Sequence, residues 1–207
     1  MQVHLDNIGK KFNTEWIFRN VSFSFDQSSA TAILGRNGSG KSTLLQVIAG
    51  NLSQTEGKVT YTFKGKNISV EEVFRYLVLV APYQELIEEF TLKEMLSFHF
   101  SFKKIIPGYT LARATDLLEF SNARNKQIRQ FSSGMKQRVK LILALLSDVP
   151  LLLLDEPTMN LDQQGIDWYL RLVQEFGKSR TMIIGSNQHL TESAFTSKSL
   201  MIEEYKK

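Results

Sequence analysis

At residues 35–42 the chain reads Gly35-Arg36-Asn37-Gly38-Ser39-Gly40-Lys41-Ser42. This stretch matches G-x-x-x-x-G-K-[ST], the pattern of a loop that cradles phosphates. The apolar run 31–34 before it predicts a buried strand, and the apolar positions after Lys41 predict a helix over 41–49 that ends at Gly50. The sequence therefore predicts a strand, a glycine-rich loop and a helix in succession, which is the setting that this pattern requires.

The residue types of the loop suit a bound polyphosphate. Glycine lets backbone N–H groups turn toward an anion with no Cβ in the way, and the start of the helix adds its positive dipole end. We expect Lys41 to contact the β- and γ-phosphates, Ser42 to reach Mg²⁺ and Thr43 to reach the α-phosphate. The other loop residues expected to bind nucleotide are Gly35, Asn37, Gly38, Ser39 and Gly40. A glycine-rich turn that only caps a helix is the alternative, and the flanking strand and helix argue against it.

Two carboxylates follow a second apolar run. Residues 151–154 are all leucine and precede Asp155 and Glu156. In open parallel sheets, ligands bind at the carboxyl ends of the strands, so we expect Asp155 to lie near Ser42 and to hold Mg²⁺, largely through water. Glu156 is then placed to orient or deprotonate an attacking water. The alternative, a pair of acids that only solvates a strand end, loses weight beside a phosphate loop.

A second helix start has the composition of an anion-binding site. The chain there reads Phe131-Ser132-Ser133-Gly134-Met135-Lys136-Gln137-Arg138. A cation at a helix N-terminus is unfavourable by roughly 0.3–1 kcal/mol, and this start carries two cations and no acid. The pattern therefore predicts an anion receptor, whereas an ordinary serine N-cap would explain only one of the serines.

The remaining pattern predicts an α/β fold. Apolar residues alternate with period two near 1–30 and 57–68, which indicates half-buried antiparallel strands. A capping box at 91–94 predicts a helix with Leu92, Met95, His99 and Phe102 on one face. Further strands are expected at 76–80, 151–154, 181–184 and 200–202, and further helices at 111–120, 132–146 and 163–176. We therefore predict a mostly parallel sheet, an antiparallel β subdomain and a helical insertion near 88–135.

Composition excludes several classes of protein. The chain has 207 residues, which predicts one domain, and its apolar run Leu141–Leu146 has six residues against the roughly 20 that a membrane span needs. Met1–Asn13 contains no apolar run of signal-peptide length, and the absence of cysteine excludes disulfides and fits a cytoplasmic protein. The net charge of +4 is a mild excess, and the basic cluster Arg124, Lys126 and Arg129 indicates a solvated face rather than nucleic-acid binding.

With these elements in view, the chain resembles the ATP-binding domain of ABC transporters over essentially its whole length, 1–207. Residues 35–43 match the family's phosphate loop, 131–135 its L-S-G-G-Q signature, 151–156 its Walker B segment and 160–162 its D-loop. A signature beside a phosphate loop separates this family from other phosphate-loop ATPases. The resemblance implies a single domain with the P-loop NTPase core, ATP and Mg²⁺ as ligands, and ATP hydrolysis.

The resemblance also assigns residues outside these segments. Phe12 takes the position where the family stacks an aromatic ring on adenine, with Trp16 as a second candidate and core packing as the alternative. Gln84 takes the Q-loop position, which implies contact with Mg²⁺ and the attacking water. Ser132 and Gly134 take signature positions that contact a γ-phosphate.

Partners follow from the same resemblance. It implies that two chains pair head to tail, because a signature contacts the γ-phosphate held by the other copy, and that ATP joins the pair until hydrolysis reopens it. The second subunit is another copy or a homologous ATPase. The groove beside 84–102 would receive a cytoplasmic helix of a separate permease, so the expected location is cytoplasmic and peripheral to the inner face of the membrane.

The chain departs from the family at two sites. In the signature, Ser133 replaces a glycine and Met135 replaces the glutamine. At the H-switch, the strand 181–186 leads to Asn187 rather than histidine, and His189 lies two residues on. Asparagine forms hydrogen bonds but cannot share a proton. We therefore expect either that hydrolysis is slower or that His189 takes over the role of the switch histidine. The alternative for His189 is an exposed residue at a helix start.

Two other functions compete with the transporter subunit. A soluble ABC-type regulatory ATPase would act on a cytoplasmic complex, but such relatives usually carry two ATP domains or extra arms. A small-molecule kinase with a phosphate loop would leave the signature-like residues 131–135 unexplained. The sequence favours the ATPase subunit of a transporter over both.

Overall fold

The computed structural model describes residues 1–187 and 195–206. The chain divides into two compact units. We call the first the phosphate-loop unit; it contains Met1–Leu79, Val149–Glu156 and Gly177–Lys207. We call the second the helical unit; it contains Val80–Asp148 and Pro157–Phe176. The predicted helical insertion near 88–135 falls within the second of these ranges, and its own limits stay a prediction.

A five-stranded sheet brings the strands with chemical residues at their ends to one edge. Its order is β6 (Leu77–Val80), β7 (Leu151–Asp155), β8 (Thr181–Ser186), β3 (Ala30–Leu34) and β9 (Lys198–Met201). The β7–β8, β8–β3 and β3–β9 pairs are parallel. The register pairs Leu34 with Ser186 and Asp155 with Gly185, so the glycine loop, Glu156 and Asn187 all follow the same edge. Parallel pairing therefore builds the site from segments that are distant in sequence.

An antiparallel sheet forms the other layer of the phosphate-loop unit. Its order is β2 (Glu15–Phe25), β1 (Gln2–Phe12), β4 (Glu56–Phe63) and β5 (Lys66–Ile68). Val3 and Leu5 are fully buried while their neighbours in β1 are exposed, as the period-two alternation predicts. The register of the β1–β2 pairing shifts between Leu5 and Ile8 and twice more before Lys11.

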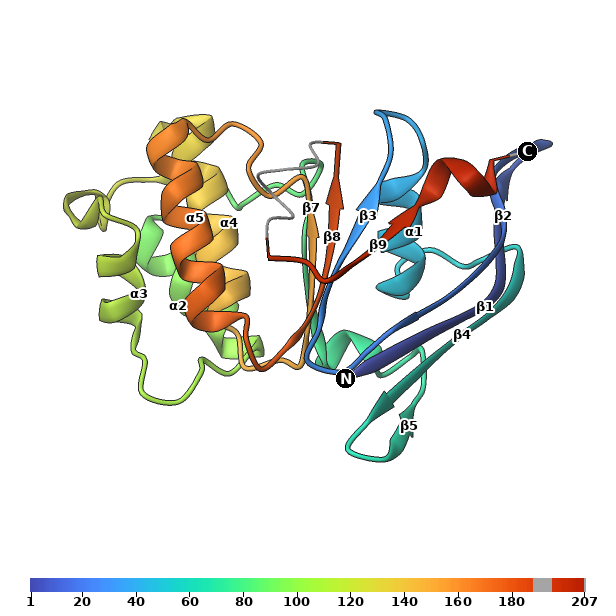
Figure 1. Cartoon of the computed structure of the whole chain (residues 1–207). Helices are drawn as coiled ribbons and strands as arrows, with labels where there is room; N and C mark the ends of the chain where they lie inside the picture. Colours follow the sequence, from blue (N-terminus) through green and yellow to red (C-terminus); the bar gives the residue numbers. More distant parts are fainter. Residues whose placement is uncertain (188–194, 207) are drawn as a thin grey trace. The chain divides into compact units, whose positions relative to one another are not determined.

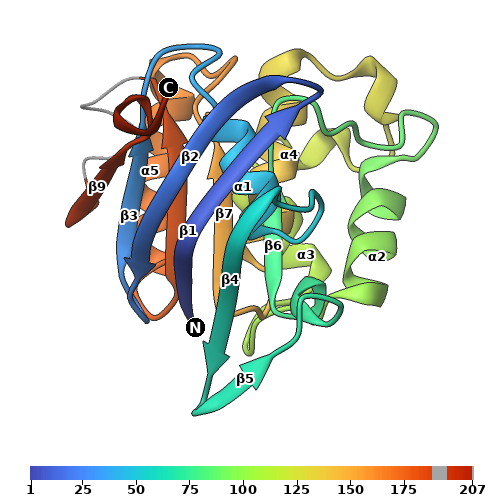
Figure 2. The same ribbon diagram turned by 90° about the vertical axis from the view of Figure 1, so that its right-hand side faces the viewer.

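Helix α1 (Lys41–Ile48) lies between these two sheets (Figures 1 and 2). Leu44, Leu45 and Ile48 are fully buried, and the Tyr61 hydroxyl of β4 donates to the Ile48 carbonyl at 2.9 Å. Burial raises the pKa of Tyr61, so its hydroxyl stays a donor. Packing on both sides fixes the helix whose first turn carries Lys41.

The helical unit contains four helices within the described residues. These are α2 (Leu92–Phe102), α3 (Leu111–Leu117), α4 (Ser133–Leu145) and α5 (Gln163–Phe176), and α4 and α5 lie side by side (Figure 1). The predicted capping box is present at the start of α2: the Thr91 hydroxyl accepts from the Glu94 N–H at 3.3 Å, and the Glu94 carboxylate accepts from the Thr91 N–H at 2.8 Å. The short helices η2 (Ser121–Ala123) and η3 (Ile128–Gln130) lie in the same unit, whereas η1 (Val73–Arg75) and η4 (Ile202–Tyr205) belong to the phosphate-loop unit.

The mixed α/β fold class is confirmed, and a few local predictions were wrong. Phe102 does not share the buried face of Leu92 and Met95; it ends α2 with 75% of its surface exposed. The helix expected at 111–120 ends at Leu117, and the strand expected at 181–184 continues to Ser186. Within the described residues, no helix combines the length and apolar character needed to cross a bilayer.

Candidate nucleotide-binding site

The phosphate loop joins β3 to α1 with the backbone that its glycines permit. Gly40 is the N-cap of α1 with φ of 107°, a left-handed conformation, and a Cβ there would lie 2.8 Å from Ile17 Cγ2. A Cβ on Gly35 would lie 2.5 Å from Ser39 Oγ. Because Gly40 has no side chain, the N-cap residue offers no acceptor to the first N–H groups of α1. Unpaired N–H groups at the start of a helix favour a bound anion.

Lys41 is folded back into the loop. It is 3% exposed, and its Nζ donates to the carbonyls of Gly35 at 2.9 Å and Arg36 at 3.1 Å. Glu156 Oε1 lies 3.9 Å from the same Nζ. The ammonium group therefore sits inside the cradle, compensated by two carbonyls and one carboxylate.

The interior of the loop fits a polyanion. Ser39 is 2% exposed, and among the residues that the structure describes its Oγ has no hydrogen-bond partner. A buried hydroxyl without a partner costs free energy unless a ligand or water completes it. This hydroxyl, the uncapped helix start and Lys41 together supply the donors that a phosphate chain requires.

Asp155 and Glu156 lie at the end of β7, as predicted. Asp155 is 1% exposed, and Gly185 of the neighbouring strand leaves room for it, since a Cβ on Gly185 would lie 2.7 Å from Asp155 Oδ1. The Glu156 N–H donates to the Gly185 carbonyl at 2.8 Å, and Glu156 has φ of 46°. A positive φ at a non-glycine residue is strained and is often found at functional sites.

The structure brings Asn187 to the phosphate loop. Its Nδ2 donates to Asn37 Oδ1 at 3.0 Å. The residue at the predicted switch position therefore contacts the turn 36–39 of the loop, which we call the outer turn. His189, the alternative switch residue, lies outside the described residues. Among the described residues there is no group of three or more His, Cys, Asp or Glu that could hold a metal. Mg²⁺ is usually held by one or two carboxylates together with oxygens of a bound phosphate, and Asp155 is a carboxylate at this edge of the sheet.

The two aromatic candidates for adenine stacking differ in environment. Phe12 is 46% exposed, with Lys10 Nζ 4.9 Å from its ring centroid. The Trp16 ring lies against the backbone of Gly9, where a Cβ would approach it to 2.9 Å, and Arg19 stacks on it at 4.5 Å. Phe12 is therefore the more available ring.

In the helical unit, Gln84 is held by the turn in which it lies. Its Oε1 accepts from the Ala81 N–H at 3.1 Å. Lys140 of α4 reaches the Ala81 carbonyl at 3.5 Å, and burial lowers the pKa of Lys140 while Glu85 acts in the opposite direction. The turn that carries Gln84 is thus tied to the helix that begins with the signature.

The start of α4 has a serine cap, and its two cations form ion pairs. The Ser132 hydroxyl accepts from the Met135 N–H at 3.2 Å. Lys136 pairs with Glu88, and Arg138 pairs with Glu119 at 3.3 Å. Carboxylates of the same unit thus compensate both cations, and the anion receptor at this helix start stays a prediction.

Gly134 is needed where the signature meets the D-loop. A Cβ on Gly134 would lie 2.9 Å from the Asn160 carbonyl oxygen, and Asn160 itself has φ of 65°. Ser132, Gly134, Asn160 and Asp162 line one cavity of about 320 Å³. The helical unit thus presents the signature glycine and serine together at a hollow.

Sequence reasoning missed three residues that shape the site. Gly185 makes room for Asp155, and Glu203 and Lys206 contact the loop from outside. A glycine at the end of an apolar strand could have indicated the first. No motif marks the other two, because their contacts depend on the pairing of β9 with β3.

Comparison with known proteins agrees with this geometry. The family model described as ABC transporter matches residues 18–159. The chain is 29% identical over 191 residues to the lantibiotic transport ATP-binding protein SrtF of Streptococcus pyogenes, covering 90% of this chain and 79% of that protein. It is 30% identical over 196 residues to the cytochrome c biogenesis ATP-binding export protein CcmA of Agrobacterium fabrum, covering 92% and 91%.

A solved structure shows the same fold. A dimeric structure of a bacterial ABC transporter cassette superimposes with a TM-score of 0.78 at 24% identity, over 97% of this chain and 95% of that one. The family match spans well over half of the chain. This chain therefore belongs to the ABC transporter family as an ATP-binding subunit, and its enzymatic class is that of an ATPase.

Proposed function

We propose that this ATPase subunit holds Mg²⁺-ATP at the phosphate loop, closes on a second ATPase subunit and drives a separate membrane permease. The observation that carries the proposal is the convergence of the uncapped α1 start, buried Lys41 and the carboxylates Asp155 and Glu156 at one edge of one sheet. Such a set of groups can bind a triphosphate and activate a water for its hydrolysis. The names of SrtF and CcmA, with transport and export in them, favour a permease over a soluble complex as the partner.

Each residue has a proposed role in binding. The loop residues Gly35, Asn37, Gly38, Ser39 and Gly40 surround the phosphates, Thr43 reaches the α-phosphate, and Phe12 stacks on adenine. Lys41 turns from its two carbonyl partners toward the β- and γ-phosphates. Ser42, Asp155 and Gln84 would hold Mg²⁺, which would supply positive charge beside the phosphates.

Hydrolysis is assigned to Glu156 with help from Gln84 and Asn187. Glu156 accepts a proton from the attacking water or orients it, and Gln84 fixes that water. Asn187, which contacts Asn37 in the loop, donates a hydrogen bond where other family members have histidine. It cannot carry a proton, so hydrolysis in this subunit is slower than in histidine-bearing relatives.

A second subunit completes the site in this proposal. Ser132 and Gly134 of one copy contact the γ-phosphate held by its partner, which fits a helix start with a serine, a glycine and a cavity. The dimeric form of the similar cassette supports the pairing. ATP binding then favours the closed pair, and hydrolysis releases it.

A cluster of three phenylalanines in and just before α2, which we call the aromatic ladder, supports a permease as the partner. Phe90, Phe98 and Phe102 stack edge to face with centroid distances of 5.5 Å and 5.2 Å, and Phe98 and Phe102 are 43% and 75% exposed. Exposed aromatic clusters mark protein-binding surfaces. We infer that a cytoplasmic segment of the permease covers this ladder, and that the subunit is therefore cytoplasmic and attached to the membrane through it.

The experiment is co-purification of the tagged chain from membrane and cytosolic fractions of its own cells, followed by ATPase assay. Wild type is expected in the membrane fraction with a multi-span protein. Phe98→Ser with Phe102→Ser is expected to lose that protein while keeping ATP binding. Phe74→Ser serves as the matched control, since Phe74 is 57% exposed in the phosphate-loop unit. Recovery with a cytosolic complex and no membrane protein would contradict the permease and support a regulatory ATPase.

A further inference from the structure

The segment 202–206 holds the outer turn of the phosphate loop from outside. The Arg36 N–H donates to Glu203 Oε1 at 3.0 Å, and Lys206 Nζ donates to the Gly38 carbonyl at 3.2 Å. Ile202, next to Glu203, is fully buried, which anchors the segment. The phosphate-loop pattern includes neither Glu203 nor Lys206, and the roles proposed above use neither.

One peptide group links Glu203 to Lys41. The peptide between Gly35 and Arg36 accepts from Lys41 Nζ through its carbonyl at 2.9 Å and donates to the Glu203 carboxylate through its N–H at 3.0 Å. Hydrogen bonds at both ends of one peptide polarise each other, and bonds to charged groups are the stronger ones. Glu203 and Lys41 are therefore hydrogen-bonded to opposite ends of the same peptide group.

Lys206 fixes the other end of the same turn. The Ser39 N–H donates to the Arg36 carbonyl at 3.1 Å, which closes the turn 36–39, and Lys206 holds the Gly38 carbonyl within it. Lys206 is exposed, and in the described part of the chain it forms no ion pair with a carboxylate. Its charge is therefore directed at the loop rather than at an acidic neighbour.

We propose that Glu203 and Lys206 are positioning residues of the nucleotide site, a clamp that holds the outer turn in the shape in which the loop receives the phosphate chain. Glycine gives this loop freedom that it must lose when a ligand binds. A clamp that orders the turn before the ligand arrives reduces the entropy lost on binding and so raises the affinity for the nucleotide. The inference rests on the proposed binding of ATP at this loop.

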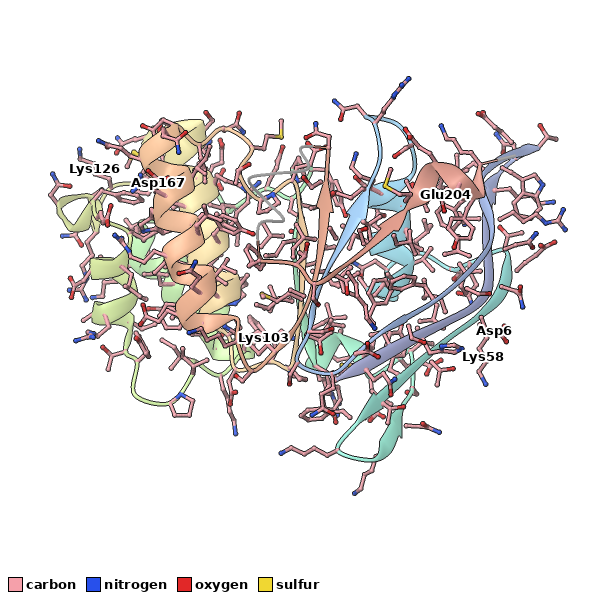
Figure 3. The ribbon with its side chains drawn as sticks, viewed as in Figure 1. Asp6, Lys58, Lys103, Lys126, Asp167 and Glu204 are labelled. Carbon is pink, nitrogen blue, oxygen red and sulfur yellow. The ribbon has the colours of Figure 1, made fainter. Side chains whose placement is uncertain are left out.

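Nucleotide affinity is the first test. ATP titration of wild type, Glu203→Ala, Glu203→Gln and Glu204→Ala is read by fluorescence of a labelled analogue, with melting temperature measured alongside. Glu203→Ala is expected to bind ATP about fivefold more weakly, as loss of one hydrogen bond predicts. Glu203→Gln keeps an oxygen that accepts the Arg36 N–H, so it is expected to recover most of that loss. Glu204, exposed on η4 and labelled in Figure 3, is the matched control with the same change of charge.

Trypsin supplies a readout that needs no nucleotide. Arg36 is exposed, and Glu203→Ala releases its N–H. Trypsin is therefore expected to cleave the Arg36–Asn37 bond of Glu203→Ala at least about threefold faster than that of Glu204→Ala. Mass spectrometry measures the cleavage. Lys206→Met is expected to weaken ATP binding as well, with Lys206→Arg restoring it because arginine still donates to the Gly38 carbonyl.

The outcomes separate the clamp from the proposed function. Equal ATP affinity and equal cleavage in Glu203→Ala and Glu204→Ala would overturn the clamp while leaving ATP binding by wild type intact. Tighter binding by Glu203→Ala would also overturn it, because the carboxylate would then act by repelling phosphate. A wild-type chain that binds no ATP would contradict the proposed function itself and the clamp with it.

Discussion

The starts of α1 and α4 are both predicted to meet phosphate, and they are built differently. The first is capped by Gly40, which has no side chain to offer, and it places a buried cation, Lys41, inside the loop. The second is capped by the Ser132 hydroxyl, and its cations Lys136 and Arg138 are paired with carboxylates of its own unit. The start of α1 offers a cation and N–H groups that its N-cap residue does not pair, while the start of α4 offers neutral donors.

This difference indicates that the two helix starts have different roles in binding phosphate. A cradle with a cation and several free amides can hold a polyphosphate on its own, since charge-assisted bonds are about twice as strong as neutral ones. A start with a serine and a glycine, without a free cation, binds an isolated anion weakly. It suits a phosphate that another surface already holds, which is the role that the head-to-tail pairing gives it.

The largest effect is expected from Glu156→Gln, which separates ATP binding at the phosphate loop from ATP turnover. Glu156→Gln removes the proposed base but keeps the size of the side chain, so turnover should fall by at least about 100-fold. ATP binding should persist, and the dimer should accumulate in gel filtration with Mg²⁺-ATP. Full turnover by this variant, or a monomer at every concentration, would contradict the role of Glu156.

The helical unit should lose stability in acid through His99. Burial, with a smaller contribution from Lys103, lowers the pKa of His99 to about 4, and its Nε2 lies 2.9 Å from Ser147 Oγ. Between pH 6.5 and 4 the unfolded chain binds a proton there that the folded chain does not. Stability should therefore fall over this range as pH decreases, by roughly 2–3 kcal/mol, and level off below pH 4.

Urea unfolding at a series of pH values measures this effect. In His99→Gln, the free energy of unfolding should depend less on pH between 6.5 and 4. In His4→Gln, a change at an exposed histidine in the other unit, the slope of unfolding free energy against pH should be that of wild type. An unchanged slope in His99→Gln would show that His99 is not the group responsible.

The switch position gives a smaller effect on rate. Asn187→His introduces a group that shares a proton beside Asn37, so ATP turnover should rise by about tenfold, below the roughly 10²–10⁴-fold of a fully positioned acid or base. His189→Ala should lower the rate if His189 substitutes for the missing histidine. If neither variant changes the rate, the role of the switch position in this chain is refuted.

Ser132→Ala gives the smallest effect on the folded monomer. Loss of the N-cap of α4 should cost about 1 kcal/mol of stability, and ATP binding by the monomer should not change. Ser42→Ala should do the reverse, with weaker Mg²⁺-dependent ATP binding and little change in stability. Equal loss of monomer ATP binding in both variants would break the distinction between the two helix starts.

The sequence predicts the loop well because each of its residues is dictated locally. Gly35, Gly40 and Lys41 follow from a backbone that only glycine adopts and from a charge that a phosphate needs. Local signals fail where the partner is distant in sequence. Nothing near Lys136 reveals that Glu88 compensates it, and nothing near Glu203 reveals that Arg36 is its partner, because tertiary pairing decides both.

The same limit applies to Phe102. Its spacing places it on the apolar face of α2, but burial depends on whether another element covers the last turn of a helix. Here the ring remains exposed and stacks on Phe98 instead. The exception is informative, because an aromatic ring left uncovered at a predicted core position marks a candidate surface for a partner.

Disulfide crosslinking tests the central claim most directly, because the chain contains no cysteine of its own. Arg36→Cys in one preparation and Ser133→Cys in another are mixed and oxidised with a non-hydrolysable ATP analogue. The account predicts a mixed dimer of the two variants that forms with the analogue and not without nucleotide. No mixed crosslink at any nucleotide concentration, with ATP binding shown to be intact in both variants, would contradict a phosphate chain shared between the loop of one subunit and the signature of the other.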